Sequence, residues 1–391
     1  MTSMMARPRS GADLRLPAMD SALLIAVVVL AGFGIVMVAS ASMHLGEPDG
    51  DVLRYVNRHL FALALGTLAA WAVYQTPTHW WHKSSTTLYF VGLALLLLVF
   101  VPGLGREANG ALRWVAAGPL SLQTSEFMKV FIVLYMSSYL VRRQLEVAHS
   151  PWGFVKPILL LLLACSLLML QPDFGTTVVL LMTAFGMLFL GGAPLWQFAL
   201  LVVLAIGSLL ALVWVSPYRL ERVTSFLNPW EHAQDSGYQL AQALIAFGRG
   251  EWIGVGLGNG IQKQFYLPEA HTDFVMAVIG EEFGLLGTLL VICMFGLIVW
   301  RSYAIGAHAE RRGDRYSAYV AYGLGLWLGM QAFINIGVNV GLLPTKGLTL
   351  PFLSYGSNSI IVCCIAVGML LRVRYENRVG ADDKEGQWQR V

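Results

Sequence analysis

Ten apolar runs of about 20 residues each restrict the fold of this chain more than any other feature. They cover approximately residues 20–42, 58–76, 84–102, 122–141, 154–171, 175–192, 194–215, 273–300, 317–341 and 350–371. An α-helix rises about 1.5 Å per residue, so about 20 residues cross a hydrocarbon layer about 30 Å thick. Because backbone polar groups must be satisfied inside lipid, such runs form helices. The sequence therefore predicts an all-α, polytopic membrane helix bundle with about ten transmembrane helices.

The composition excludes several other classes of protein. Only 13% of the 391 residues are charged, whereas soluble domains contain about 25%. The net charge of +3 and the lack of a Lys/Arg-rich run argue against a nucleic-acid partner. The four cysteines and eight histidines lack the spacing of a metal site. The first apolar run is longer than a signal peptide requires, so we expect an uncleaved anchor.

Basic residues predict the orientation of the bundle. Arg142, Arg143 and the arginines of residues 301–315 lie in short loops that have no equal on the opposite side. Positive residues are enriched in cytoplasmic loops. We therefore expect a transmembrane domain at residues 17–376 between cytoplasmic tails at 1–16 and 377–391. The loops at 103–121, 216–272 and 342–349 would then be extracytoplasmic, and 216–272 is the large periplasmic loop.

The large loop has a pattern of its own. Tyr238, Ala241, Leu244, Ile245 and Phe247 recur at helical spacing opposite polar residues, which predicts an amphipathic helix in the membrane interface. This helix would be either a structural cover or one wall of a groove for a lipid-linked head group. The glycine-rich residues 254–260 do not predict a nucleotide site, because no strand precedes them and they lie on the side without ATP.

A polar loop joins an apolar helix within residues 266–284. Glu269, His271 and Asp273 lie in this loop, directly before the apolar run. In a structural interpretation, Thr272 is the N-cap and Asp273 is a first-turn acid that the helix dipole stabilises. In a functional interpretation, an aspartate at the boundary between membrane and water takes a proton from a substrate that is half lipid.

Two adjacent acids follow in the same apolar run. Glu281 and Glu282 lie about 12 Å deeper than Asp273 along the helix. Carboxylates inside a span are costly and seldom face lipid. At about 100° per residue, Glu281 is closer in direction to Asp273 than Glu282 is. Glu281 therefore lines the same cavity as Asp273, or either acid pairs with a buried base of another helix, which we favour.

Three basic residues are candidates for binding an anionic head group. Lys129 lies in the middle of a span, where Glu126 on the same face is its local partner. Arg113 lies in an outward loop, and arginine binds a diphosphate with two parallel hydrogen bonds. Lys346 is a second outward cation near the membrane. Alone, each is explained as a local pair or a surface charge; together they fit an anionic lipid ligand.

Several short motifs occur in a characteristic order. They are Asn109-Gly110 with Arg113-Trp114, Gln123 and Ser125-Glu126 with Lys129, Gln171 to Thr176, Gln239 to Gly260, Pro268 to Phe274, and Pro351 to Gly356. Together they resemble the SEDS family of bacterial cell-wall polymerases (shape, elongation, division and sporulation). Residues 269–274 and 343–351 look like the division branch rather than the elongation branch. Thr124 and Ser357 stand where the family usually has proline and glycine, which affects local geometry but removes no chemical group.

The resemblance implies a peptidoglycan glycosyltransferase of the septum that acts on lipid II, an undecaprenyl-diphosphate-linked disaccharide-pentapeptide. It also implies a partner in the division complex, a single-pass class B penicillin-binding transpeptidase of the FtsI type. The expected location is the cytoplasmic (inner) membrane at the septum. Asp273 is the expected catalytic residue. The residues expected to contact the substrate are Arg113, Glu126, Lys129, Glu269, His271, Thr272, Glu281, Lys346 and Ser354.

The predicted reaction is a single displacement with inversion, in which Asp273 is the general base and undecaprenyl diphosphate leaves. No cofactor is evident. A divalent cation (Mg²⁺ or Mn²⁺) that shares the stabilisation of the diphosphate is left open, because no ligand spacing in the sequence indicates one. Two other functions stay open. Buried charges in a ten-helix bundle also suit a lipid II flippase, and the protein would otherwise be a non-enzymatic scaffold of the division complex.

Overall fold

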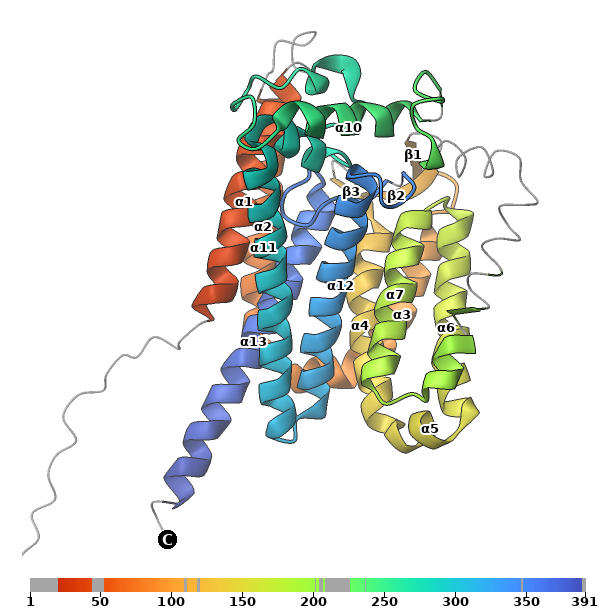
Figure 1. Ribbon diagram of the computed structural model, residues 1–391. Helices are drawn as coiled ribbons and strands as arrows, with labels where there is room; N and C mark the ends of the chain where they lie inside the picture. Colours follow the sequence, from red (N-terminus) through yellow and green to blue (C-terminus); the bar gives the residue numbers. More distant parts are fainter. Residues whose placement is uncertain are drawn as a thin grey trace, which may run out of the picture.

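The computed structural model describes residues 20–43, 53–108, 111–117, 120–200, 202–203, 207, 226–235, 237–345 and 347–388. They form a bundle of long helices with one three-stranded sheet at one end (Figure 1). The helices that pass along the bundle are α1 (Ser21–Ser42), α2 (Arg54–Gln75), α3 (Thr78–Leu98), α4 (Thr124–Arg142), α6 (Pro151–Leu170), α7 (Phe174–Leu190), α11 (Val275–Arg311), α12 (Arg315–Asn339) and α13 (Ser357–Trp388). The shorter elements are α5 (Gln144–His149), α10 (Tyr238–Gly250) and the π-helix η2 (Gln262–Tyr266).

The prediction of several membrane-spanning helices is confirmed. Six of the described helices are long and apolar enough to cross a membrane, namely α1, α2, α6, α11, α12 and α13, and α7 is a shorter apolar helix. The chain is therefore a multi-pass membrane protein. The expected span at 194–215 falls mostly outside the described residues, so the count of ten stays a prediction.

Helix α4 is less apolar than its neighbours because it lies inside the bundle. Fifteen of its 19 residues are buried, including Glu126, Lys129, Ser137 and Ser138. It packs against α3, α7 and α12. Polar side chains are tolerated there because protein atoms, rather than lipid, surround them.

The loop expected at 103–121 contains a small antiparallel sheet, which the all-α prediction missed. Its strands are β1 (Gly105–Ala108), β2 (Ala111–Ala117) and β3 (Leu120–Gln123), in the order β1-β2-β3. Trp114 of β2 pairs with Arg106 on one side and Gln123 on the other. Strands of four to seven residues give too short a pattern to be recognised beside helical runs of 20. The sheet fixes the position of Arg113 in β2.

The last span begins later than predicted. Helix α13 starts at Ser357 rather than at residue 350, because residues 350–354 form turns that are buried in the bundle. Pro351 has no N–H group for a helix, and Phe352 adopts a φ of 64°. Apolar residues indicate that a segment is buried, but they do not show whether it is a helix. Residues 350–353 are apolar because they form a buried turn.

Helix α11 is broken at Gly284, where φ is 63° and ψ is −156°. Four backbone hydrogen bonds of 2.9–3.2 Å join residues 281–286 to residues 251–256. Non-helical backbone at membrane depth requires such partners from the protein itself. Gly284 suits the break because a Cβ there would lie 2.5 Å from the amide nitrogen of Gly254.

The predicted amphipathic helix of the large loop is confirmed as α10, which lies across the end of the bundle that also carries the sheet (Figure 1). Its buried face differs from the expected one. Ala243 and Ala246 are buried, whereas Ile245 is 38% exposed. Small residues are favoured because α10 packs closely on α11, where a Cβ on Gly250 would lie 1.8 Å from the carbonyl of Gly280.

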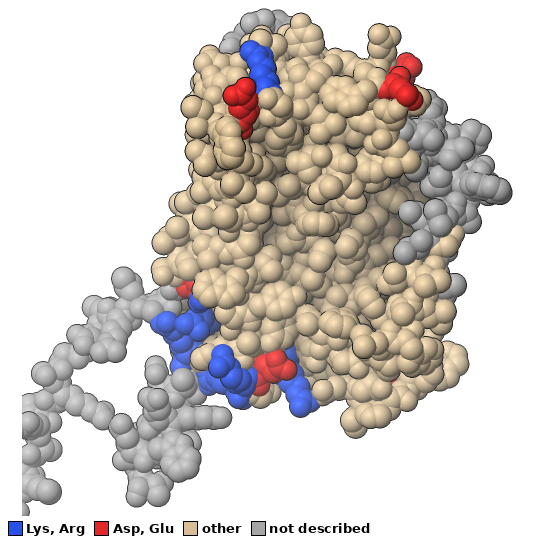
Figure 2. Space-filling view, viewed as in Figure 1, with Lys and Arg blue, Asp and Glu red and all other residues tan. Residues whose placement is uncertain are grey.

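The two ends of the bundle differ in charge. Helix α1 begins, and α13 ends, at the end opposite to α10 (Figure 1). Lysine and arginine gather at that end on the visible face (Figure 2). Arg301 forms an ion pair with Asp20 there, while Arg311 and Arg315 are exposed.

Candidate active site

Asp273 ends a tight turn that leads into α11. The backbone N–H groups of Thr272, Asp273 and Phe274 all donate to the carbonyl of Glu269, which has a φ of 56°. The carbonyl of Asp273 accepts hydrogen bonds from the side chains of Asn335 (2.9 Å) and Asn339 (3.0 Å) in α12. The turn closed by Glu269 and the side chains of α12 therefore hold the backbone of Asp273.

The structural interpretation of Thr272 and Asp273 was wrong. Helix α11 begins at Val275, and its N-cap is Phe274. Asp273 thus precedes the first turn, and the Thr272 hydroxyl donates to the Glu269 carboxylate at 2.6 Å. Because Glu269 closes the turn with its own carbonyl, the helix starts after the turn has been completed.

The environment of Asp273 raises the pKa of its carboxyl group. The side chain is half-buried. Desolvation, reinforced by the charges of Glu269 and Asp173 and opposed by Arg113, raises its pKa from 3.8 to about 7. Among the described residues, neither carboxylate oxygen accepts a hydrogen bond. A carboxylate with a pKa near the working pH and with uncommitted oxygens suits general base catalysis.

Arg113 lies close enough to Asp273 to act on its charge. Its Nε donates to the carbonyl of Gln171 at 3.3 Å, and its Nη2 donates to the carbonyl of Pro172. A guanidinium group has five N–H donors, so others are left for an anionic ligand. The structure thus brings together Arg113 and Asp273, which lie 160 residues apart in the sequence.

His271 belongs to an aromatic cluster beside the turn. Its ring centre lies 5.1 Å from that of Tyr55 at the start of α2 and 5.7 Å from that of Tyr355. The N–H of Tyr355 donates to the carbonyl of His271 at 2.9 Å. All three rings are partly exposed.

Four more residues expected at the site lie in or near the turns that flank α11 and α13, or outside the described residues. Glu269 and Thr272 lie in the turn itself, and Glu269 is exposed. Ser354 is buried, and its hydroxyl accepts a hydrogen bond from the N–H of Leu350 at 2.8 Å, which stabilises the turn before α13. Lys346 lies outside the described residues.

Lys129 and Glu126 form the local pair that the sequence allowed. Their charged atoms are 2.8 Å apart, and Lys129 also donates to Gln331 of α12 at 2.9 Å. Only 1% of Lys129 and 4% of Glu126 is exposed. These contacts join α4 to α12, and Gln331 lies one helical turn from Asn335, whose amide donates to the carbonyl of Asp273. Among the described residues, neither Lys129 nor Glu126 forms a hydrogen bond or ion pair with Asp273.

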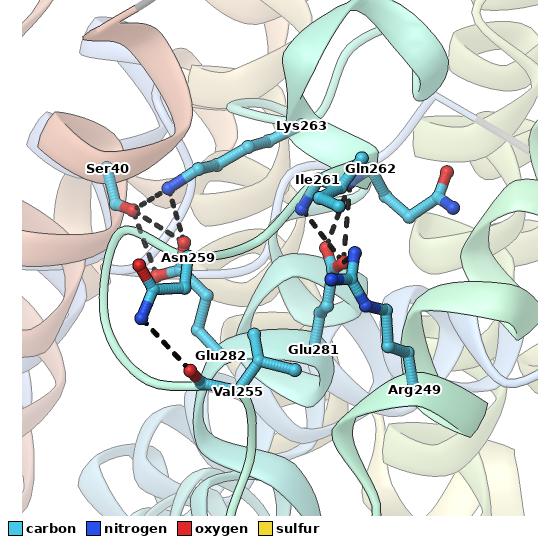
Figure 3. A network of polar contacts seen from close by, with 9 residues as sticks. All are labelled: Ser40, Arg249, Val255, Asn259, Ile261, Gln262, Lys263, Glu281 and Glu282. Atoms are coloured by element: carbon cyan, nitrogen blue, oxygen red, sulfur yellow. Dashed lines mark hydrogen bonds and ion pairs between the residues drawn. The ribbon is translucent and has the colours of Figure 1, made fainter.

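Glu281 and Glu282 pair with basic residues, as we favoured. Glu281 lies 3.2 Å from Arg249 of α10 and also accepts hydrogen bonds from the N–H groups of Ile261 and Gln262 (Figure 3). Glu282 pairs with Lys263 of η2 (Figure 3). The oxygens of Glu281 are therefore occupied by protein donors.

Asn335, Asn339 and Asp173 are parts of the candidate site that were not predicted from the sequence. Asn335 and Asn339 are four residues apart in an apolar helix, a spacing that places both amides on one face and could have revealed them. Asp173 caps α7 by accepting from the N–H of Thr176 at 3.3 Å. Its second oxygen is buried without a hydrogen-bond partner in the described part of the chain.

A metal site is not evident where the structure can be described. No group of three or more His, Cys, Asp and Glu side chains there could hold a metal ion. The participation of Mg²⁺ or Mn²⁺ stays a prediction.

Comparisons with known proteins agree with this fold. The sequence profile of the cell cycle protein family that includes FtsW, RodA and SpoVE matches residues 21–379. A probable peptidoglycan glycosyltransferase FtsW of Allochromatium vinosum is 53% identical over 356 residues, which cover 91% of this chain and 89% of the relative. A protein of the same name from Nitrosococcus halophilus is 54% identical and covers 93% of this chain and 94% of its own length.

Solved structures give the same result. One chain of a peptidoglycan synthase complex that coordinates polymerization and crosslinking is 31% identical, with a TM-score of 0.75, over 92% of this chain and 99% of its own. The rod shape determining protein RodA of Thermus thermophilus is 28% identical, with a TM-score of 0.68, over 92% and 98%. By sequence profile, close relatives and fold, the chain belongs to the FtsW/RodA/SpoVE family of cell cycle proteins.

Proposed function

We propose that this protein joins lipid II disaccharide units into glycan strands at the outer face of the cytoplasmic membrane, with Asp273 as general base. As a member of its family, the chain is a peptidoglycan glycosyltransferase. The observation that carries the mechanism is the half-buried carboxyl group of Asp273, with a pKa of about 7, beside the guanidinium group of Arg113.

The reaction is a single displacement. The Asp273 carboxylate removes the proton from the 4-hydroxyl of the acceptor N-acetylglucosamine as its oxygen attacks the anomeric carbon of the growing chain. The bond from that carbon to the diphosphate breaks, and undecaprenyl diphosphate leaves with the electron pair. Arg113 stabilises the negative charge that develops on the diphosphate. One displacement inverts the anomeric carbon.

The charge distribution supports the orientation. Helix α11 ends at Arg311 and α12 begins at Arg315, at the end of the bundle opposite to α10 (Figure 1). Because basic residues gather at this end, we place it and both termini on the cytoplasmic side (Figure 2). The turn with Asp273 is then extracytoplasmic. The division-type relatives support septal enrichment, and the solved complex supports a class B penicillin-binding transpeptidase as the partner.

Purified protein with labelled lipid II, with and without the partner transpeptidase, tests the proposal. Glycan chains longer than the disaccharide are expected in detergent and in vesicles. Movement of lipid II across vesicles without polymerisation would support a flippase instead. Neither activity, with intact binding to the partner, would support a scaffold.

The rate should depend on pH in the direction that a carboxylate base requires. Below the pKa of about 7 the Asp273 carboxyl group is protonated and inactive. We expect kcat for polymerisation to rise by about tenfold per pH unit below pH 6 and to level off above about pH 8. Rates measured from pH 5.5 to 9 with saturating lipid II check this. A flat profile would contradict the role of Asp273.

Arg113→Ala should reduce kcat/KM for lipid II by about 10–100-fold, because a charge-assisted contact with the diphosphate is lost. The control is Arg106→Ala, which removes an exposed arginine of β1 in the same sheet. Initial rates over a range of lipid II concentrations give the ratio. Equal values for both variants would show that Arg113 is only a surface charge.

A further inference from the structure

The break in α11 is tied to the large loop by a compact set of contacts, which we call the α11 joint. It comprises the ion pairs Arg249–Glu281 and Lys263–Glu282, the hydroxyl of Ser40 in α1, and the backbone bonds between residues 251–256 and 281–286. Figure 3 shows the two glutamates of α11 side by side, each directed at its own basic partner.

The Lys263–Glu282 pair is deeply buried. The exposed fractions of the two side chains are 6% and 0%. Ser40 receives a hydrogen bond from Lys263 at 2.6 Å and donates to Glu282 at 2.8 Å. Two buried charges are costly even when they are paired, and apolar residues of similar size often stabilise a fold equally well. Stability alone therefore gives no reason for an ion pair at this position.

The second pair fixes the backbone as well. Glu281 is fully buried and accepts from the N–H groups of Ile261 (2.9 Å) and Gln262 (3.1 Å) in addition to Arg249. Gly260 passes between the two acids, where a Cβ would lie 2.9 Å from an oxygen of Glu281 and 3.1 Å from one of Glu282. The two carboxylates therefore closely confine the backbone at Gly260, which leads into η2.

The joint closes a loop in the chain, and Asp273 lies within this loop. Lys263 is ten residues before Asp273, and Glu282 is nine residues after it. The contacts of Glu281 with Ile261 and Gln262 close the same loop at its base. On the opposite side, the carbonyl of Asp273 is held by Asn335 and Asn339.

We propose that the α11 joint is a positioning device for Asp273, in which the Lys263–Glu282 pair sets the place of the turn relative to α11. The inference rests on the proposed function of Asp273. Lys263, Glu282 and Ser40 are positioning residues, and they act through the turn rather than on the substrate. Because the loop has two fixed points, the joint and α12, loosening one of them lets the turn move while the fold is retained. A displacement of about 1 Å at a reacting group can cost about 10²-fold in rate.

Three variants test this proposal: Lys263→Met, Glu282→Gln, and the double variant. Each single variant leaves one buried charge or polar group without its partner, so a loss of thermal stability is expected. The double variant removes both charges and should recover most of the melting temperature. Its kcat should nevertheless stay at least about tenfold below wild type, while KM for lipid II changes by less than about threefold.

The pH profile gives an independent readout. A looser turn admits water to Asp273 and lowers its pKa, so the acid limb of kcat in the double variant should move to lower pH by about one unit. The matched control is the exposed pair Arg143–Glu146 on the other end of the bundle, changed to Met and Gln in the same way. This control should leave the melting temperature, kcat and pH profile unchanged.

The outcomes separate the two proposals. If wild type polymerises lipid II and Asp273→Asn does not, but the double variant keeps the wild-type rate and pH profile, the positioning role is wrong and the function stands. Recovery of both melting temperature and kcat in the double variant would show that the pair is only structural. If wild type with its partner transpeptidase makes no glycan, the function itself fails.

Discussion

Asp273→Asn is expected to abolish polymerisation of lipid II, with a fall in kcat of at least about 10²–10⁴-fold. The amide has nearly the shape of the carboxylate but cannot accept the proton of the sugar hydroxyl. The contacts of the backbone carbonyl with Asn335 and Asn339 are retained, so the turn keeps its position. Glycan chain formation by the purified protein with its partner transpeptidase is the measurement.

The same variant should be more stable than wild type above neutral pH. The folded-state pKa of Asp273 is raised from 3.8 to about 7, so the folded protein binds this proton more tightly than the unfolded chain does. The destabilisation is therefore absent below about pH 4 and complete above about pH 7. We expect Asp273→Asn to gain on the order of 2–4 kcal/mol at pH 8, the lower value allowing for partial exposure.

Melting curves at pH 5 and pH 8 check this stability effect, with Asp235→Asn as the control. Asp235 is an exposed carboxylate of the same large loop, and its substitution should change neither rate nor melting temperature. An active Asp273→Asn enzyme would exclude Asp273 as the base. An inactive variant that is also less stable at pH 8 would indicate a structural role for the carboxylate.

Lys129→Met is expected to destabilise the folded protein strongly. Lys129 is 1% exposed, its ammonium group donates to Glu126 and Gln331, and its Nζ lies 5.5 Å from the ring centre of Trp327. Its removal leaves Glu126 buried without a counter-charge, and one oxygen of Glu126 already lacks a partner among the described residues. Breaking such a pair costs about 3–5 kcal/mol.

The double variant Glu126→Leu/Lys129→Met shows whether the destabilisation of Lys129→Met comes from the unpaired carboxylate of Glu126. Because both charges are removed together, the melting temperature should return close to that of wild type. For the single variant, we expect a fall on the order of 5–10 °C in detergent. If Lys129 held the substrate instead, the single variant would melt like wild type and lose only its use of lipid II.

The general architecture could be predicted from the sequence because a membrane imposes a simple requirement. Each apolar run of about 20 residues must form a helix to satisfy its backbone, and most of the predicted runs coincide with helices of the described bundle. The periodicity of residues 238–250 predicted α10 for a similar reason. Asp273 was singled out because a polar loop with three titratable side chains, Glu269, His271 and Asp273, leads directly into an apolar run.

The details that failed depend on contacts between distant residues. The start of α11 was placed too early, at Thr272, because the turn closed by Glu269 competes with the helix for the same N–H groups. The break at Gly284 was missed because the hydrogen-bonded backbone pairs around it are 26 or 34 residues apart in the sequence, and hydropathy describes the partner loop only as polar. The sheet was missed because its strands are short.

Local features of the sequence were sufficient to predict a helical membrane protein, the charged residues inside it, and an acid directly before an apolar helix. These are local properties, set by apolar length and by the cost of burying a charge. The more distant partners of these charges depend on the fold: Gln331 for Lys129, Lys263 for Glu282, and Arg113 beside Asp273. A buried charge requires a partner, but the low dielectric that creates this requirement does not specify which residue meets it. The packing of the helices determines which charges become neighbours, and it thereby also sets the pKa of Asp273.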